Sequence, residues 1–331
     1  MADDTCSPAE AASVAASSLA AGSSVQTPPA TPAREPSAGL ARRFRSPAAA
    51  QRFAAAYAEL AGRWPQPLTA LDVGGEFGTT RVLACGPAGG SPVVLLPGHG
   101  ATAAVWFATA QALGGSHRVY AIDPVGDAGL SVAAGRAARR PADLVSWLDG
   151  VLGELGLDAT ALCGHSYGGW LALRYALARP ERVTRLALLD PTDCFAPMSL
   201  AYRLRAVPLL LRPAERRARA LVGWEAGGRA DRDGAALDDA ALTVHALSAE
   251  FRSARIVLPK RPPAADLAGL QLPVLILLAG RSRSHDAASV SGRAGELLPS
   301  ARIVTLAGAS HHSVPANDHA ELNRELAAFL G

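Results

Sequence analysis

Short apolar runs alternate with longer helix-like stretches along most of the chain. The apolar runs contain four or five nearly continuous hydrophobic residues each, and they occupy residues 93–96, 119–122, 160–163, 186–189 and 274–278. Strands buried on both faces have this pattern, because helices cover both sides of a parallel sheet. The stretches between them predict helices over residues 103–113, 141–155 and 167–178. Strand alternating with helix predicts an open α/β sheet with right-handed crossover connections.

The first part of the chain has a different pattern. Residues 1–40 are mostly Ala, Ser, Thr and Pro, so they bury too little apolar surface to offset the entropy lost on ordering. We predict a disordered tail over residues 1–40 and an α/β domain over residues 41–331. A signal peptide is not predicted, because Asp3 and Asp4 replace the usual basic start and no strongly apolar segment follows. We therefore expect a cytoplasmic protein.

One interval breaks the alternation of strands and helices. Roughly 80 residues separate the apolar run that ends at Leu189 from the run that begins at Val274, which is too long for a simple loop. Apolar residues recur in this interval at helical spacing. We predict a helical insertion over about residues 194–265, which forms a cap above the carboxyl ends of the strands.

The predicted cap is rich in arginine. Six arginines lie close together in its first part: Arg203, Arg205, Arg212, Arg216, Arg217 and Arg219. We interpret them as a solvated helix face whose aliphatic stems cover apolar surface. The alternative is a surface that receives an anionic acyl group or its carrier.

Composition excludes several classes of protein. The 331 residues are 49% hydrophobic and 18% charged, which is enough apolar material for a sizeable core. The net charge of +3 is too close to neutral to indicate a nucleic-acid partner, and no segment has the pattern of a membrane span. Four scattered cysteines form neither a disulfide framework nor a metal-binding C-x-x-C pair. We expect no metal and no cofactor, because Walker and Rossmann glycine patterns are also absent from the sequence.

The segment over residues 162–170 carries the strongest chemical signal. An apolar strand runs directly into Gly164-His165-Ser166-Tyr167-Gly168, and a helix-forming stretch follows at once. A Gly-x-Ser-x-Gly turn between strand and helix is the context that a nucleophile elbow requires, with the serine Oγ raised above the sheet. Glycines flank the serine because a Cβ atom in so tight a turn would collide with the backbone.

Further motifs give the chain a family resemblance. They are Phe77-Gly78-Thr79-Thr80, Leu95-Leu96-Pro97-Gly98-His99-Gly100, Trp106, Ala121-Ile122-Asp123 and Pro180-Glu181-Arg182-Val183. With the elbow, they resemble capped carboxylesterase-like serine hydrolases of bacterial type in the α/β-hydrolase superfamily, over about residues 71–331. The resemblance implies an α/β-hydrolase fold: a mostly parallel eight-stranded sheet, helices on both faces and a helical cap. It also implies hydrolysis of a small-molecule acyl substrate.

A serine nucleophile needs a general base, and the sequence offers a candidate near its end. Ala309-Ser310-His311-His312-Ser313 follows the last apolar strand, residues 303–306, and precedes the final helix, residues 320–330. The family places its catalytic histidine in this loop, usually after a glycine, and Ser310 stands at that glycine here. The resemblance therefore implies that His311 is the base and His312 its neighbour.

The oxyanion hole is expected to use two backbone N–H groups. One belongs to Tyr167, which follows the nucleophile, and the other to the loop after the predicted strand at residues 93–96. Similarity to the family's oxyanion loop implies that His99 donates this second N–H. Pro97 stands where that loop commonly has a histidine, so the His99 side chain itself is not required for catalysis.

The triad acid is less clearly marked. Family members usually carry Asp or Glu three or four residues past the glycine that ends the seventh strand, but Arg283 and Ser284 occupy those positions after Gly280. Asp286 is the nearest carboxylate and our preferred acid, although it is also suited to cap the helix that follows. Asp193 and Asp190, after the predicted strand at residues 186–189, are the alternatives.

We therefore predict a serine hydrolase that cleaves a carboxylic ester, lactone or thioester through Ser166, Asp286 and His311. Carbon–carbon bond hydrolysis and cofactor-free perhydrolase activity are possible on the same triad. Dehalogenase and epoxide hydrolase relatives carry Asp at the position of Ser166, which disfavours their chemistry here. A non-catalytic ligand receptor or signalling partner on the same fold is the alternative from a different class.

Overall fold

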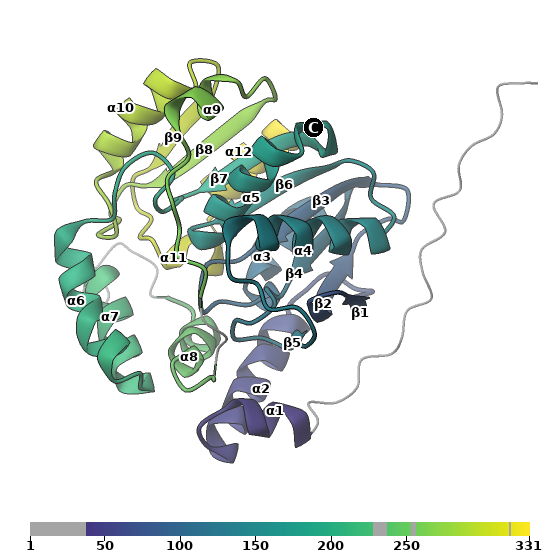
Figure 1. The fold of residues 1–331 in the computed structure, drawn as a ribbon, viewed down its shortest axis with the longest axis vertical. Coiled ribbons are helices and arrows are strands. Elements are labelled where there is room, and N and C mark those ends of the chain that lie inside the picture. Colours follow the sequence, from purple (N-terminus) through teal and green to yellow (C-terminus); the bar gives the residue numbers. More distant parts are fainter. Residues whose placement is uncertain (1–37, 228–236, 253–255, 318) are drawn as a thin grey trace, which may run out of the picture.

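The computed structural model describes residues 38–227, 237–252, 256–317 and 319–331 (Figure 1). Residues 1–37 of the predicted tail lie outside this described part. The tail prediction is wrong for residues 38–40, which begin helix α1 (Ala38–Arg43). Leu40 is buried with Phe44 and Phe53 in one hydrophobic cluster, and this burial holds the segment against the rest of the molecule.

Nine strands form one sheet within the described residues. In chain order they are β1 (Thr69–Gly75), β2 (Gly78–Cys85), β3 (Ser91–Leu96), β4 (His117–Ile122), β5 (Val132–Ala133), β6 (Thr160–His165), β7 (Val183–Leu189), β8 (Val274–Ala279) and β9 (Arg302–Leu306). Their spatial order is β1-β2-β4-β3-β6-β7-β8-β9, with β5 paired to β2. β2 pairs antiparallel with β1, β4 and β5, and every pair from β4 to β9 is parallel. The predicted mostly parallel eight-stranded sheet is confirmed, with β5 as a short addition.

Helices cover both faces of the sheet (Figure 1). The 3₁₀ helix η1 (Ala103–Trp106), α2 (Pro47–Gly62), α3 (Phe107–Leu113), α11 (Ser313–Ala316) and α12 (Ala320–Leu330) share one hydrophobic cluster. The other cluster holds α4 (Pro141–Glu154), α5 (Tyr167–Ala178) and α10 (Ala287–Leu297). Leu95 of β3 packs into the first cluster and its neighbours Val94 and Leu96 into the second, because successive strand residues point to opposite faces.

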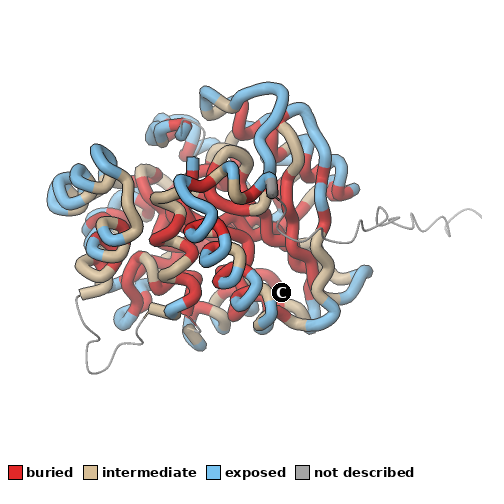
Figure 2. Tube along the Cα trace, turned by 90° about the horizontal axis from the view of Figure 1, so that it is seen from below, coloured by how far each residue is buried: buried red, intermediate tan, exposed pale blue. Residues whose placement is uncertain are grey.

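The buried residues form the middle of the molecule, and exposed residues lie at its margins (Figure 2). This layering explains why the continuous apolar runs predicted strands correctly: each of the five lies within β3, β4, β6, β7 or β8. Among the helices in the described part of the chain, none combines the length and the apolarity that crossing a bilayer requires.

The described part of the interval between β7 and β8 consists of four helices and the loops that join them. It contains α6 (Leu200–Leu211), α7 (Glu215–Glu225), α8 (Asp239–Ser248) and α9 (Ala264–Ala268). α8 packs against α2 and α7, α6 packs against α7, and α9 lies beside α10. The helices α6, α7 and α8 therefore lie next to one another at one side of the sheet, and α8 joins them to α2 (Figure 1).

Candidate active site

Ser166 occupies a strained turn between β6 and α5. Its backbone has φ 52° and ψ −115°, a left-handed φ that residues other than glycine seldom adopt. A Cβ atom on Gly164 would lie 2.3 Å from the carbonyl oxygen of Gly168, and one on Gly168 would lie 2.2 Å from that of Leu96. The two glycines are therefore required by close backbone contacts, as the sequence predicted. The turn raises the Ser166 side chain at the carboxyl end of β6.

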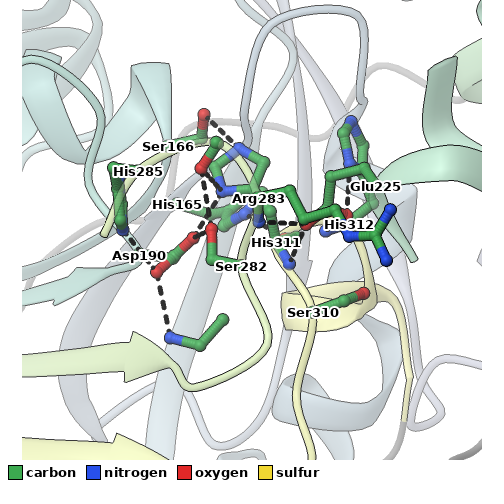
Figure 3. Close-up of polar contacts among 12 residues, drawn as sticks. His165, Ser166, Asp190, Glu225, Ser282, Arg283, His285, Ser310, His311 and His312 are labelled. Carbon is green, nitrogen blue, oxygen red and sulfur yellow. Dashed lines mark hydrogen bonds and ion pairs between the residues drawn. The ribbon is translucent and has the colours of Figure 1, made fainter. Parts of the chain in front are cut away.

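Ser166, His311 and Asp190 form a continuous hydrogen-bonded chain (Figure 3). The Oγ atom of Ser166 lies 2.9 Å from Nε2 of His311, and Nδ1 of His311 lies 2.6 Å from Oδ2 of Asp190. Parallel strands bring their carboxyl ends to one edge of a sheet, and β6 and β7 are neighbours there. This placement puts the residues that follow these two strands, Ser166 and Asp190, within reach of one histidine.

Hydrogen-bonding chemistry fixes the proton on His311. An ionised carboxylate only accepts hydrogen bonds, so Nδ1 donates to Asp190 and Nε2 of the neutral ring accepts from the Ser166 hydroxyl. Burial lowers the pKa of His311, but the hydrogen bond and the negative charge of Asp190 outweigh burial and raise the pKa above its usual value. His311 is therefore oriented and polarised to take a proton from Ser166.

Asp190 is fully buried and accepts hydrogen bonds from four groups. Besides His311, they are the backbone N–H of Ala279, the hydroxyl of Ser282 and Nε2 of His285, at 2.9, 2.8 and 2.9 Å from its carboxylate oxygens. Burial raises the pKa of Asp190, but the hydrogen bonds from His285 and His311 outweigh it and hold the pKa well below its usual range. Asp190 is thus an ionised carboxylate in a buried, fully hydrogen-bonded position.

The preferred sequence assignment of the acid, Asp286, is contradicted by this geometry. Asp286 is exposed, and its carboxylate accepts hydrogen bonds from the backbone N–H and the hydroxyl of Ser289, at 2.9 and 2.6 Å. It is the N-cap of α10, and these two hydrogen bonds lower its pKa. Of the two alternatives, Asp190 contacts His311, whereas no hydrogen bond from Asp193 to another described residue is found.

Asp286→Asn is expected to leave both kcat and thermal midpoint nearly unchanged, because asparagine keeps a good capping oxygen. Asp286→Ala is expected to destabilise the protein by about 0.5–2 kcal/mol through loss of the cap, again without a change in kcat. Thermal unfolding and ester turnover of the two variants, measured side by side, separate a cap from an acid. A tenfold loss of kcat in Asp286→Asn would restore Asp286 to the triad.

The loop that carries His311 is held by a buried carboxylate from α7. Glu225 is only 1% exposed, and its two carboxylate oxygens accept hydrogen bonds from the backbone N–H groups of His311 and His312, at 2.9 and 3.2 Å. Nδ1 of His312 also lies 3.0 Å from Glu225. Burial alone raises the pKa of Glu225, but the hydrogen bond with His312 outweighs it and lowers the pKa to about 2.

A second contact holds the same loop from the elbow. Nε2 of His165 lies 2.8 Å from the carbonyl oxygen of His311 and donates its proton to it. Burial lowers the pKa of His165 well below its usual value, so this ring stays neutral. The backbone of His311 is therefore fixed at its N–H by Glu225 and at its carbonyl by His165 (Figure 3).

Glu225→Gln is expected to lower kcat by roughly tenfold to a hundredfold, because a small displacement of a reacting group is this costly. Glutamine keeps one acceptor oxygen but turns an N–H donor toward groups that themselves donate. The pH profile is a second readout: the charge of Glu225 raises the pKa of His311, so its removal shifts the acid limb of activity to lower pH. Glu215→Gln, at the opposite end of α7, is the matched control and is expected to retain both kcat and the acid limb.

The expected oxyanion residues lie beside the nucleophile. A Cβ atom on Gly98 would lie 3.2 Å from Cβ of Ser166, so the loop after β3 passes next to the elbow. Tyr167 is the first residue of α5, where a backbone N–H has no acceptor within the helix. The backbone N–H of His99 likewise has no hydrogen-bond acceptor among the described residues. Both N–H groups are thus available to a substrate oxygen.

Asp127 shapes the loop that contains His99. One of its carboxylate oxygens lies 2.8 Å from Nδ1 of His99 and 3.0 Å from the backbone nitrogen of Gly100. The charge of Asp127 raises the pKa of His99 above its usual value. The ring of His99 is therefore engaged by Asp127, and its backbone N–H is the group left for an oxyanion.

A cavity of about 230 Å³ adjoins these two residues. His99 and Tyr167 are part of its wall, which is otherwise largely apolar and includes Phe77, Leu144, Trp147, Leu171 and Val257. Such a cavity accommodates an uncharged apolar group next to the oxyanion position. No cluster of three or more potential metal ligands is found among the residues that the structure describes.

Sequence reasoning missed the residues that surround the triad. Ser282 and His285 follow β8, where the acid was expected, and they contact Asp190 instead of replacing it. The absence of a carboxylate at Arg283 and Ser284 was the signal that the acid comes from another strand. Glu225 had no such signal, because nothing in the periodicity of α7 separates a buried acid from a surface one.

Comparison with known proteins places the chain among hydrolases. The model of the family described as "Alpha/beta hydrolase family" matches residues 93–325. Carboxylesterase YbfK and the uncharacterized carboxylesterase nap, both from Bacillus subtilis (strain 168), are 33% and 32% identical over 144 and 146 residues. Each alignment covers 44% of this chain, and the chain spans about half the length of these curated relatives, 48% in both cases.

Two solved structures from the same organism resemble this one over most of its length. Carboxylesterase CesB (YbfK) superposes with a TM-score of 0.76 at 26% identity, covering 86% of this chain and 98% of that chain. Naproxen esterase (carboxylesterase NP) has the same TM-score at 24% identity, with the same two coverages, and supports the fold alone.

Proposed function

The chain belongs to the alpha/beta hydrolase family, and on this premise we propose that it hydrolyses carboxylic esters through an acyl-enzyme on Ser166. The observation that carries the proposal is the unbroken chain from Ser166 Oγ through His311 to Asp190, with distances of 2.9 and 2.6 Å. A serine hydroxyl is a weak nucleophile at neutral pH until an adjacent base takes its proton. This arrangement supplies that base and the carboxylate that orients it.

The proposed reaction has two halves that use the same groups. His311 takes the proton of Ser166, whose Oγ attacks the ester carbonyl, and the N–H groups of His99 and Tyr167 bind the oxyanion. His311 then gives this proton to the leaving alcohol oxygen. In the second half His311 removes a proton from water, which attacks the acyl-enzyme, and the proton returns to Ser166 as the acid leaves. Asp190 remains ionised and stabilises the imidazolium in both halves.

The substrate class follows from the cavity and the relatives. The wall next to His99 and Tyr167 is largely apolar, so we assign one uncharged apolar group of a small-molecule ester to this cavity. Both Bacillus relatives are named carboxylesterases, which agrees with this substrate class. A cavity of this size favours a compact group over a long chain.

We also propose that α6, α7 and α8 act as a cap on this site. Glu225 at the end of α7 contacts the backbone of the His311 loop. On the other side, a Cβ atom on Gly100 would lie 2.6 Å from Oγ of Ser248 in α8, so the oxyanion loop abuts α8 closely. Two loops of the site thus contact two helices of the insertion, which supports the predicted cap over residues 194–265.

The proposal is tested with a panel of esters of graded acyl length, assayed on the wild type and on Ser166→Ala. The wild type is expected to turn over short acyl esters and to react covalently with a fluorophosphonate probe, and Ser166→Ala is expected to do neither. A wild type that neither labels nor hydrolyses any ester of the panel would instead favour a ligand-binding role.

A further inference from the structure

The outward surface of α6 is apolar and uncovered. Leu200, Leu204, Val207 and Leu211 are 67%, 63%, 40% and 76% exposed, and Leu210 beside them is 74% exposed. None of the twelve residues of α6 is buried. A soluble protein seldom exposes so continuous an apolar surface unless the surface has a partner. α6 projects at the left of Figure 1, and the same side of Figure 2 is coloured largely as exposed.

Helical geometry places the exposed side chains on one stripe. Successive residues are rotated by about 100°, so positions 200, 204, 207 and 211 point in nearly the same direction. The opposite side of α6 faces the molecule: Tyr202 and Trp224 of α7 have ring centroids 6.3 Å apart. α6 is therefore anchored along one side and leaves the stripe free.

Positively charged residues accompany this stripe along the chain. Arg203 and Arg212 lie on α6 or at its end, and Arg216, Arg217 and Arg219 follow on α7, whereas Arg205 lies over the ring of Trp224 on the side of α6 that faces the molecule. Glu215 is the only acidic residue between positions 199 and 220, and it is already paired with Arg52 and Arg219. Arg203, Arg212 and Arg216 are exposed, and no ion pair to another described residue is found for them. The surface is thus apolar in its centre and cationic at its border.

We propose that the outward face of α6 docks on a lipid bilayer that contains anionic lipid. In this orientation the apolar stripe enters the boundary between headgroups and acyl chains, while the arginines reach the lipid phosphates. Long arginine stems suit this position because they contact apolar material and keep the guanidinium in water. An anionic bilayer therefore matches both the apolar and the cationic part of the surface.

A second copy of this chain is a less suitable partner for the α6 surface. A dimer formed through this stripe would bring the arginines of the two copies close together. Glu215 would not offset their charge, because it is already paired with Arg52 and Arg219. Like charges at such close range oppose association. Charge complementarity consequently favours an anionic surface over a symmetric dimer.

Vesicle co-sedimentation of the full chain tests the proposal. The wild type is expected to pellet with vesicles of equal parts phosphatidylglycerol and phosphatidylcholine, and to bind vesicles of phosphatidylcholine alone more weakly. Leu204→Gln with Leu211→Gln, and separately Arg203→Gln with Arg212→Gln, are expected to weaken binding to the anionic vesicles about tenfold or more. All these side chains are exposed, so the thermal midpoints and the turnover of a water-soluble ester are expected to stay at the wild-type values.

The matched control replaces an exposed apolar residue and an exposed arginine at a site away from α6. Val132→Gln with Arg139→Gln removes one exposed apolar residue and one exposed arginine near β5, and is expected to bind vesicles like the wild type. The proposal is overturned if the wild type stays in the supernatant with anionic vesicles, or if the two α6 variants pellet as the wild type does. It is equally overturned if sedimentation shows a wild-type dimer that Leu204→Gln with Leu211→Gln converts to a monomer. Vesicle binding does not depend on the catalytic assignment.

Discussion

Ser166→Ala is expected to lower kcat by about a thousandfold or more and to abolish labelling by a fluorophosphonate probe. The Oγ atom is the proposed nucleophile, and no neighbouring hydroxyl occupies its position 2.9 Å from Nε2 of His311. Alanine leaves the oxyanion N–H groups in place, so a residual rate above that of the uncatalysed reaction is also expected. The thermal midpoint is expected to change little, because one hydroxyl is lost and the strained backbone of the turn remains.

Ser289→Ala is the control for this experiment. Ser289 is an exposed hydroxyl on α10 that contacts Asp286 and no group of the triad. This variant is expected to label and to turn over ester like the wild type. More than a tenth of the wild-type kcat remaining in Ser166→Ala would remove Ser166 from the nucleophile role.

Asp190→Asn is expected to lower kcat by about a hundredfold to ten thousandfold. The carboxylate accepts from Nδ1 of His311 and so fixes the ring with Nε2 free to take the serine proton. An asparagine at this position has one acceptor oxygen and one donor group for four surrounding donors. The variant is therefore also expected to be less stable, by about 1–3 kcal/mol, because buried donors lose their acceptor.

The pH profile of Asp190→Asn provides a readout that destabilisation alone does not move. Asp190 raises the pKa of His311, and catalysis needs this ring neutral, so wild-type activity is lost as pH falls through that raised pKa. Without the carboxylate the pKa falls, and the acid limb of the remaining activity shifts to lower pH. Asp193→Asn and Asp286→Asn are run beside it and are expected to keep the wild-type profile. An unchanged kcat in Asp190→Asn would mean that His311 works without this partner.

The nucleophile and its fold were predictable because their signals are local. Nine consecutive residues around Ser166 contain the end of a buried strand, the two glycines that the turn needs and the start of a helix. The strands on either side were equally visible, because burial on both faces removes polar residues from a run. Nothing outside each segment had to be known for these predictions.

The acid was not predictable in the same way. Asp190 and Asp286 both follow strands of the sheet, and the choice between them depends on where each side chain points. Asp190 turns toward His311 at a residue with φ 42°, whereas Asp286 turns back onto the first turn of α10. The sequence does not show the positive φ, nor that two residues after Gly280, Ser282 and His285, direct their hydrogen bonds to Asp190. Position along the chain therefore favoured the wrong carboxylate.

The arginine-rich part of the insertion agrees with its interpretation at one residue. Among the six arginines interpreted as cover for apolar surface, Arg205 lies over the ring of Trp224. The apolar spacing in this interval predicted helices, and α6 is a helix, but its Leu200 and Leu204 face solvent. Helical periodicity predicts an apolar stripe but does not predict which surface covers it.

Two hydrogen bonds from the His311 loop to Glu225 make the position of His311 in the triad depend on the docking of α7. Molecules in which α7 has moved away from the His311 loop lack the anchor of the His311 backbone, so they hold the base less well. Thermodynamic linkage makes the relation reciprocal: a compound that binds only the assembled triad must strengthen the docking of α7 by the same factor. A bound compound therefore stabilises the docked position of α7, although this helix contributes no residue to the triad. The expected sign of this effect is slower hydrogen exchange of the α7 amides.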